Sequence, residues 1–248
     1  MYPLIELGPV TFTSWEVFLH AGFWLGVAMA WRFWQRDGGR ARPFLWASSA
    51  GFLGAVVGAR LLHAAGEPGI FAEDPLRLVQ IWQLRNAGWA YMGGLAGGGL
   101  AAFAALRRQG LPVWRFADAW APGLAFAQVS ARFGCFLSGC CFGPRSVRFG
   151  LLHAAHGEAA VPRVPTPLLE LAGVLTLGVF LVAFHSRRRF EGQTFLLFLL
   201  GYGAIRFSVE FLRADHAAIL PGRLTASHLV AAALVAAAVA LWPKLERQ

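Results

Sequence analysis

Seven apolar stretches of about 20 residues each constrain this chain more than any other feature. They run near Ser14–Phe33, Pro43–Ala64, Gly88–Leu106, Phe116–Leu137, Pro165–Phe184, Thr194–Leu212 and Leu224–Trp242. A helix of that length crosses a bilayer. Only 14% of the 248 residues are charged, against about 25% in soluble domains. The sequence therefore predicts an all-α integral membrane protein with about seven transmembrane helices, one transmembrane domain over residues 1–248 and no cleavable signal peptide.

The arginines between these stretches predict the orientation of the chain. They gather after the first, third and fifth stretches, as Arg36, Arg40, Arg42, Arg107, Arg108, Arg115, Arg187, Arg188 and Arg189. Basic loops stay on the cytoplasmic side, so we expect a multi-pass membrane protein with its N-terminus outside and its C-terminus in the cytoplasm. The same distribution accounts for the net charge of +9 without a nucleic-acid partner.

Charged side chains inside two of the apolar stretches indicate a candidate site. In the sixth stretch, Tyr202, Arg206, Glu210 and Arg213 recur at helical spacing, which places them on one helix face. In the fourth, Arg132 lies within a mainly apolar helix. Ionisable residues inside a membrane are costly and usually serve a function. An internal salt bridge between Arg206 and Glu210 that only fixes packing is the alternative.

The predicted orientation brings charges and glycines to one depth, near the outer leaflet. Arg60 lies near the end of the second stretch, and Gly93 and Gly94 near the start of the third. Arg132 and Arg206 lie in the outer halves of their own stretches. Because arginine binds phosphate through two parallel hydrogen bonds, we expect a phospholipid headgroup at this depth. The spacing of the glycines more often serves close helix packing, which is the alternative to lipid contact.

The residues above resemble the motifs of the prolipoprotein diacylglyceryl transferase family, in the family's order and over most of the chain. The matching positions are Gly58, Arg60, Asp118, Ala121, Pro122, Arg132, Gly134, Phe136, Gly143, Pro165, Thr166, Leu168, Glu170, Tyr202, Arg206, Glu210, Phe211 and Arg213. The resemblance implies an enzyme of the bacterial cytoplasmic (inner) membrane, which moves diacylglycerol from phosphatidylglycerol to a lipoprotein-precursor cysteine and releases glycerol phosphate. We expect catalytic roles for Arg132, Arg206 and Glu210. The expected substrate-binding residues are Arg60, Gly93, Gly94, Tyr202 and Arg213.

The chain departs from the family pattern at the positions that would handle the thiol. The family's histidine before Gly-Gly-Leu is Met92 here, and methionine accepts no proton. The asparagine and the glutamate of the family signature are Cys135 and Cys140, and the histidine of its fifth-span motif is Val164. The phosphate-binding arginines are thus kept while the thiol side is changed. Histidines near outer span ends are candidates for a replacement base: His63, His216 and His228.

Cys135, Cys140 and Cys141 are the only cysteines of the chain, and they admit three interpretations. Cys135 could form a disulfide with Cys140 or Cys141 that pins the glycine-broken end of the fourth helix on the oxidising side of the membrane. One could be a nucleophile that nearby arginines hold as thiolate. All three could be small packing residues. We favour the disulfide or packing role. Their spacing is no standard zinc pattern, so we expect neither a metal nor a cofactor.

Two other functions stay open beside a transferase that acts on a phospholipid and a lipoprotein-like protein acceptor. A non-catalytic lipid-binding subunit would keep the arginines and lose the base, as Met92 suggests. A small transporter would also carry intramembrane charge, but the sequence has no evident inverted repeat.

Overall fold

The computed structural model describes residues 4–7, 10–74, 76, 91–153, 161–214 and 224–247. Among these residues each predicted apolar stretch corresponds to one long helix, with ends shifted by a few residues. The long helices are α1 (Ser14–Arg36), α2 (Ala41–Gly66), α4 (Tyr91–Arg108), α5 (Val113–Ser138), α6 (Thr166–Phe184), α7 (Gln193–Glu210) and α8 (Ala226–Glu246). The start expected for the third stretch, Gly88, lies outside the described residues. By length and composition, three of the described helices could cross a membrane: α2, α6 with its 3-10 extension η2 (His185–Arg187), and α8.

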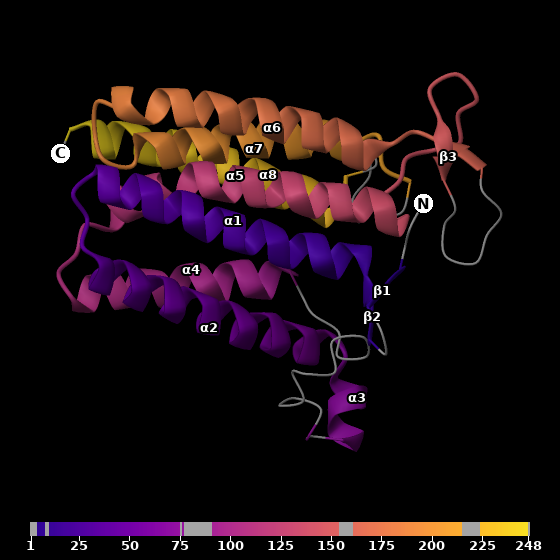
Figure 1. Cartoon of the computed structure of the whole chain (residues 1–248), viewed down its shortest axis with the longest axis horizontal. Coiled ribbons are helices and arrows are strands. Elements are labelled where there is room, and N and C mark those ends of the chain that lie inside the picture. Colours follow the sequence, from indigo (N-terminus) through magenta and orange to yellow (C-terminus); the bar gives the residue numbers. More distant parts are fainter. Residues whose placement is uncertain are drawn as a thin grey trace. The chain divides into compact units, whose positions relative to one another are not determined.

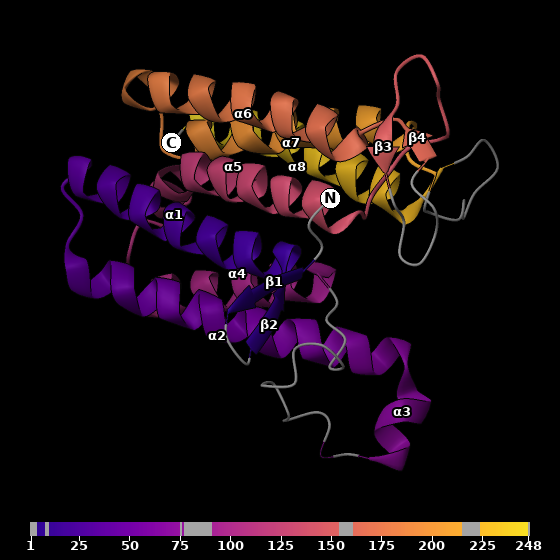
Figure 2. The ribbon, with the colours of Figure 1, turned by 45° about the vertical axis from the view of Figure 1, so that its right-hand side comes forward.

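Two short hairpins interrupt the helical chain and were not predicted. Strand β1 (Leu4–Leu7) pairs antiparallel with β2 (Val10–Thr13), and β3 (Leu151–His153) pairs with β4 (Val161–Arg163). Figure 2 shows β3 and β4 side by side. Strands of three or four residues are too short for an alternating pattern to be read from the sequence. The purely helical expectation is therefore corrected at these two places.

The chain forms two compact units, which we describe separately: Met1–Phe33 with Ala117–Gln248, and Trp34–Phe116. The expectation of a single transmembrane domain stays a prediction.

In the larger unit, α7 packs between α6 and α8 (Figure 1). The core that α5, α6 and α7 share consists of small and aliphatic side chains with one phenylalanine: Ala121, Ala125, Val174, Leu181 and Phe198. Helix α1 approaches α5 closely at Gly22, where an added Cβ would lie only 2.7 Å from the Ala127 carbonyl oxygen. The Ser130 hydroxyl also donates to the Phe18 carbonyl over 2.7 Å.

A fully buried carboxylate at the start of α5 completes the start of α7. Helix α7 follows Gly192, which has no side chain to cap the free N–H groups. Asp118 of α5 supplies the acceptor, and it receives hydrogen bonds from the N–H groups of Gly192 and Phe195 over 2.7 and 2.9 Å. Arg188 lies 3.4 Å from the same carboxylate. Since the first N–H groups of a helix lack partners within it, Asp118 fastens these helices together at one end.

In the smaller unit, α2 packs along α4, and the short helix α3 (Pro68–Glu73) follows α2. Glycines let the backbones of α2 and α4 meet: a Cβ at Gly97 would lie 2.9 Å from the Gly58 Cα atom, and a Cβ at Gly93 would collide with the Gly58 carbonyl oxygen. The small-xxx-small spacing of α4 thus serves close packing. Arg60 of α2 is 4% exposed, with its guanidinium 5.6 Å from the centre of the Phe71 ring.

Candidate functional site

The centre of the candidate site is Glu170 of α6, which joins two arginines from two other helices. Its carboxylate lies 2.9 Å from the Arg132 Nε atom of α5 and 3.1 Å from an Arg206 terminal nitrogen of α7. Only 2% of Glu170 is exposed. Figures 1 and 2 show α5, α6 and α7 as neighbouring helices of the larger unit. The two arginines predicted to bind phosphate are therefore brought together by a carboxylate that neither of their own helices supplies.

A second carboxylate extends this group along α7. The Glu210 carboxylate lies 2.7 Å from an Arg206 terminal nitrogen and 3.8 Å from the Arg213 Nε atom. Thr225, which precedes α8, donates its hydroxyl to Glu210 over 2.6 Å. Arg206 also donates to the Ser227 hydroxyl over 3.0 Å. Arg206 and Glu210 thus form the salt bridge considered from the sequence as the alternative, and Arg213, which follows the end of α7, joins them.

We call Arg132, Glu170, Arg206, Glu210 and Arg213 the arginine–glutamate chain. Three guanidiniums alternate with two carboxylates, so these five residues together carry one net positive charge. Buried charges are tolerated only when they are paired and hydrogen-bonded, and here Arg206 and both carboxylates are at least nine-tenths buried. One further monoanion beside the chain would balance its charge.

The three cysteines converge at the end of α5, next to this chain. Their sulfur atoms lie within 4.8 Å of one another, and all three are free thiols in the structure. An Arg132 terminal N–H points at the Cys141 sulfur over 3.8 Å. Hydrogen bonds with the Cys135 and Cys140 thiols, together with the guanidiniums of Arg213 and Arg132, outweigh burial and lower the pKa of the Cys141 thiol. A disulfide between any two of them stays a prediction.

The remaining predicted site residues lie in different places. Tyr202 faces α5, where its hydroxyl accepts a hydrogen bond from the Gln128 amide over 3.2 Å. Arg60, Gly93 and Gly94 belong to the smaller unit, and their substrate-binding roles stay predictions. The side chain of Met92 and the whole of His216 lie outside the described residues.

Three residues of this site had no role predicted from the sequence: Glu170, Thr225 and Ser227. Glu170 is the only ionisable residue of its apolar stretch, and the rule that singled out Arg132 would have found it. Thr225 and His228 form a capping box at the start of α8, a pattern that usually marks only a helix end. Nothing in the sequence distinguishes Ser227.

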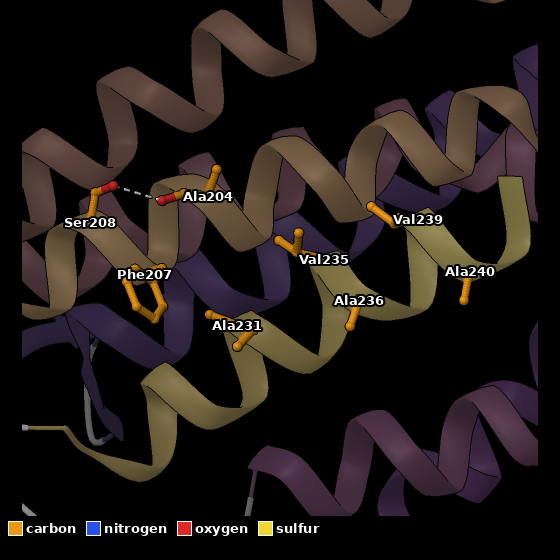
Figure 3. A pocket seen from close by; sticks show the side chains of 9 residues that line it. Ala204, Phe207, Ser208, Ala231, Val235, Ala236, Val239 and Ala240 are labelled. Carbon is orange, nitrogen blue, oxygen red and sulfur yellow. Dashed lines mark hydrogen bonds between the residues drawn. The ribbon is translucent and has the colours of Figure 1, made fainter.

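A groove of about 650 Å³ between α7 and α8 is separate from this chemistry (Figure 3). Its lining is almost wholly apolar, consisting of Ala204, Phe207, Ser208, Ala231, Ala232, Val235, Ala236, Val239 and Ala240. The Ser208 hydroxyl donates a hydrogen bond to the Ala204 carbonyl over 2.9 Å. The groove offers no group for catalysis, so the candidate site is the arginine–glutamate chain with the adjoining thiols.

Comparison with known proteins finds matches over most of the chain. A family model described as prolipoprotein diacylglyceryl transferase matches residues 3–243. Three similar proteins are named phosphatidylglycerol–prolipoprotein diacylglyceryl transferase. That of Methylibium petroleiphilum is 34% identical over 77% of this chain and 74% of its own length. That of Rhodococcus jostii is 30% identical over 94% of this chain and 70% of its own length. That of Streptomyces griseus is 29% identical over 86% of this chain and 67% of its own length.

Proposed function

Because this chain belongs to the prolipoprotein diacylglyceryl transferase family, a family of membrane enzymes, we propose that it catalyses diacylglyceryl transfer. It transfers a diacylglyceryl group from an anionic phospholipid, such as phosphatidylglycerol, to the cysteine thiol of a lipoprotein precursor. The observation that carries this proposal is the single net positive charge of the buried arginine–glutamate chain. A phosphodiester headgroup carries one negative charge and matches it.

In this reaction the acceptor thiolate attacks the diacylglyceryl carbon that bears the phosphate ester. The C–S bond forms, the C–O bond breaks, and its electron pair goes to the departing phosphate oxygen. The leaving group thereby gains a second negative charge. Arg132 and Arg206 stabilise that charge, and stabilisation of developing charge in a dry site is the largest contribution to many enzymatic rates. Glu170 and Glu210 hold the guanidiniums in place, and Arg213 lies within reach of the same phosphate.

The proposed function requires the site to face the outer leaflet. We propose seven membrane-spanning helices in the bacterial inner membrane, with the N-terminus outside and the C-terminus in the cytoplasm. The arginine-rich loops after α1, α4 and α6 support this orientation. In the smaller unit, the same orientation would put Arg60, Gly93 and Gly94 toward the outer leaflet, and their contribution to lipid binding is part of this proposal.

A second candidate function is a lipid-binding subunit without catalytic activity. Met92 favours it, because the matching histidine of the family would accept the thiol proton and methionine cannot. Such a subunit would bind phosphatidylglycerol through the same arginines and release no glycerol phosphate.

The Arg206→Lys variant tests the phosphate role. Lysine keeps the charge but not the paired donors of a guanidinium. We expect release of glycerol phosphate from phosphatidylglycerol vesicles, in the presence of a cysteine-containing precursor peptide, to fall about 100-fold. Arg148→Lys, at an exposed arginine between α5 and α6, is the control and should leave turnover unchanged.

Equal turnover in the two variants would refute the role of Arg206. Tight lipid binding without any release of glycerol phosphate, already in the unaltered protein, would favour the lipid-binding subunit.

A further inference from the structure

The three thiols beside Arg132 have the geometry of a metal site. Zinc binds cysteine sulfur at about 2.3 Å, so a tetrahedral ion holds its sulfur ligands about 3.8 Å apart. The three sulfur atoms lie within 4.8 Å of one another and need to move by less than about 1 Å to reach that spacing. The spacing of the cysteines along the chain does not predict such a site, since it matches no standard zinc pattern.

The backbone holds this arrangement against a local energetic cost. Cys141 has a φ angle of 61°, and among the described residues it is the only non-glycine residue with positive φ. A side chain in the left-handed region costs about 1 kcal/mol or more. The Thr166 hydroxyl donates to the Cys141 carbonyl, and the Gly143 N–H donates to the Val164 carbonyl over 2.9 Å. The start of α6 thus fixes the turn that directs the third sulfur toward the other two.

We propose that Cys135, Cys140 and Cys141 bind one zinc ion and leave its fourth position to the thiol of the acceptor protein. This inference rests on the proposed function. Catalytic zinc sites characteristically have three protein ligands and one position for water or substrate, whereas structural sites have four protein ligands. Three sulfurs without a fourth cysteine in the chain match the catalytic arrangement.

The site lies where thiol activation is needed. Arg132 contacts both Glu170 and Cys141, so one side chain separates the sulfur cluster from the proposed phosphate site. A thiol held by this zinc would therefore stand next to the lipid carbon that it attacks.

The proposed zinc replaces the missing base. A thiol that coordinates zinc loses its proton, which passes to water. The zinc-bound thiolate then forms the C–S bond while the C–O bond breaks and its electron pair leaves with glycerol phosphate. The neutral thioether dissociates from zinc, and the next thiol takes its place. Zinc changes no oxidation state, and Met92 needs no proton-accepting role.

Metal content tests the site without reference to activity. The full-length protein is extracted from membranes without added reductant or chelator, and its zinc is counted by mass spectrometry. We expect one zinc per chain, and loss of most of it in Cys140→Ser and Cys141→Ser. His20→Ala, at an exposed histidine of α1, is the control and should keep the metal.

Cobalt(II) tests the fourth position in the unaltered chain, so the result does not depend on whether the variants fold. Cobalt bound to the three sulfurs should give a sulfur-to-cobalt charge-transfer band. A peptide with one cysteine should shift and strengthen this band, and the same peptide with serine should not.

The outcomes separate this inference from the proposed function. Lipid transfer by a zinc-free protein, or a disulfide among the cysteines in the extracted protein, would overturn the zinc site and leave the transferase standing. Copper(I) in place of zinc, or a cobalt band indifferent to the cysteine peptide, would also overturn it. A zinc site that takes the peptide thiol, in a protein that never releases glycerol phosphate, would leave the site intact and refute the transferase.

Discussion

Replacing Glu170 by glutamine tests whether one buried carboxylate organises the site. The change keeps the size of the side chain and removes its charge. Arg132 and Arg206, whose nitrogens lie 2.9 and 3.1 Å from the carboxylate, would both lose this partner, and Arg206 would keep its contact with Glu210. The net charge of the arginine–glutamate chain would rise from one to two.

The expected loss of stability follows from these contacts. At an effective dielectric constant of about 20, two unit charges about 4 Å apart attract by about 4 kcal/mol. Glu170 makes two such contacts, and part of this attraction is offset by the cost of burying the charges. Removing one partner from a buried group of charges typically costs about 3–5 kcal/mol. For a chain of this size that corresponds to a fall in melting temperature of about 10 °C.

Turnover and lipid binding should respond differently. Both guanidiniums remain, and the positive charge is greater, so phosphatidylglycerol should bind at least as tightly. Turnover should fall about 100-fold, because a displacement of about 1 Å in a positioning group has that effect. The measurements are melting in detergent, binding of labelled lipid, and release of glycerol phosphate. Glu191→Gln, at an exposed residue before α7, is the control, and an identical profile in both variants would refute the bridging role.

Two further predictions concern the fold and its orientation. Gly97→Ala should destabilise the protein by about 1–3 kcal/mol, because the new Cβ would meet Gly58 at 2.9 Å. Gly99→Ala in the same helix has open space around it and should not destabilise, so equal unfolding of the two variants would contradict the packing of α2 on α4. In a cysteine-free background, Val147→Cys should react with an impermeant reagent from outside, and Ser186→Cys only after permeabilisation. Labelling of residue 186 in intact cells would show that the proposed orientation is wrong.

The sequence predicted the parts of the molecule that depend on neighbours along the chain. Apolar runs predicted the long helices, since a span of about 20 apolar residues has few other solutions in a membrane. The interval of four residues between Arg206 and Glu210 predicted their ion pair. These features are local, and the structure confirms them.

The features that were not predicted from the sequence depend on contacts between residues far apart along the chain. Glu170 joins Arg132 to Arg206 only because three helices converge, and no interval along the sequence encodes that. The sulfur cluster requires a positive φ angle at Cys141, a conformation that the residue itself disfavours and that the contacts of Thr166 and Gly143 impose. The hairpins are shorter than the pattern that identifies strands.

The hydrogen bonds between Asp118 and the start of α7 make the lengths of two helical segments depend on each other. Fourteen residues separate Asp118 from Arg132 in α5, and fourteen separate Gly192 from Arg206 in α7. At 1.5 Å per residue, each interval measures about 21 Å. Because the two helices are joined at one end, their arginines lie at the same distance along the helix axes from that end. Inserting one residue into either interval would raise one guanidinium by about 1.5 Å and turn it by about 100°, away from Glu170. The two lengths can therefore change only together.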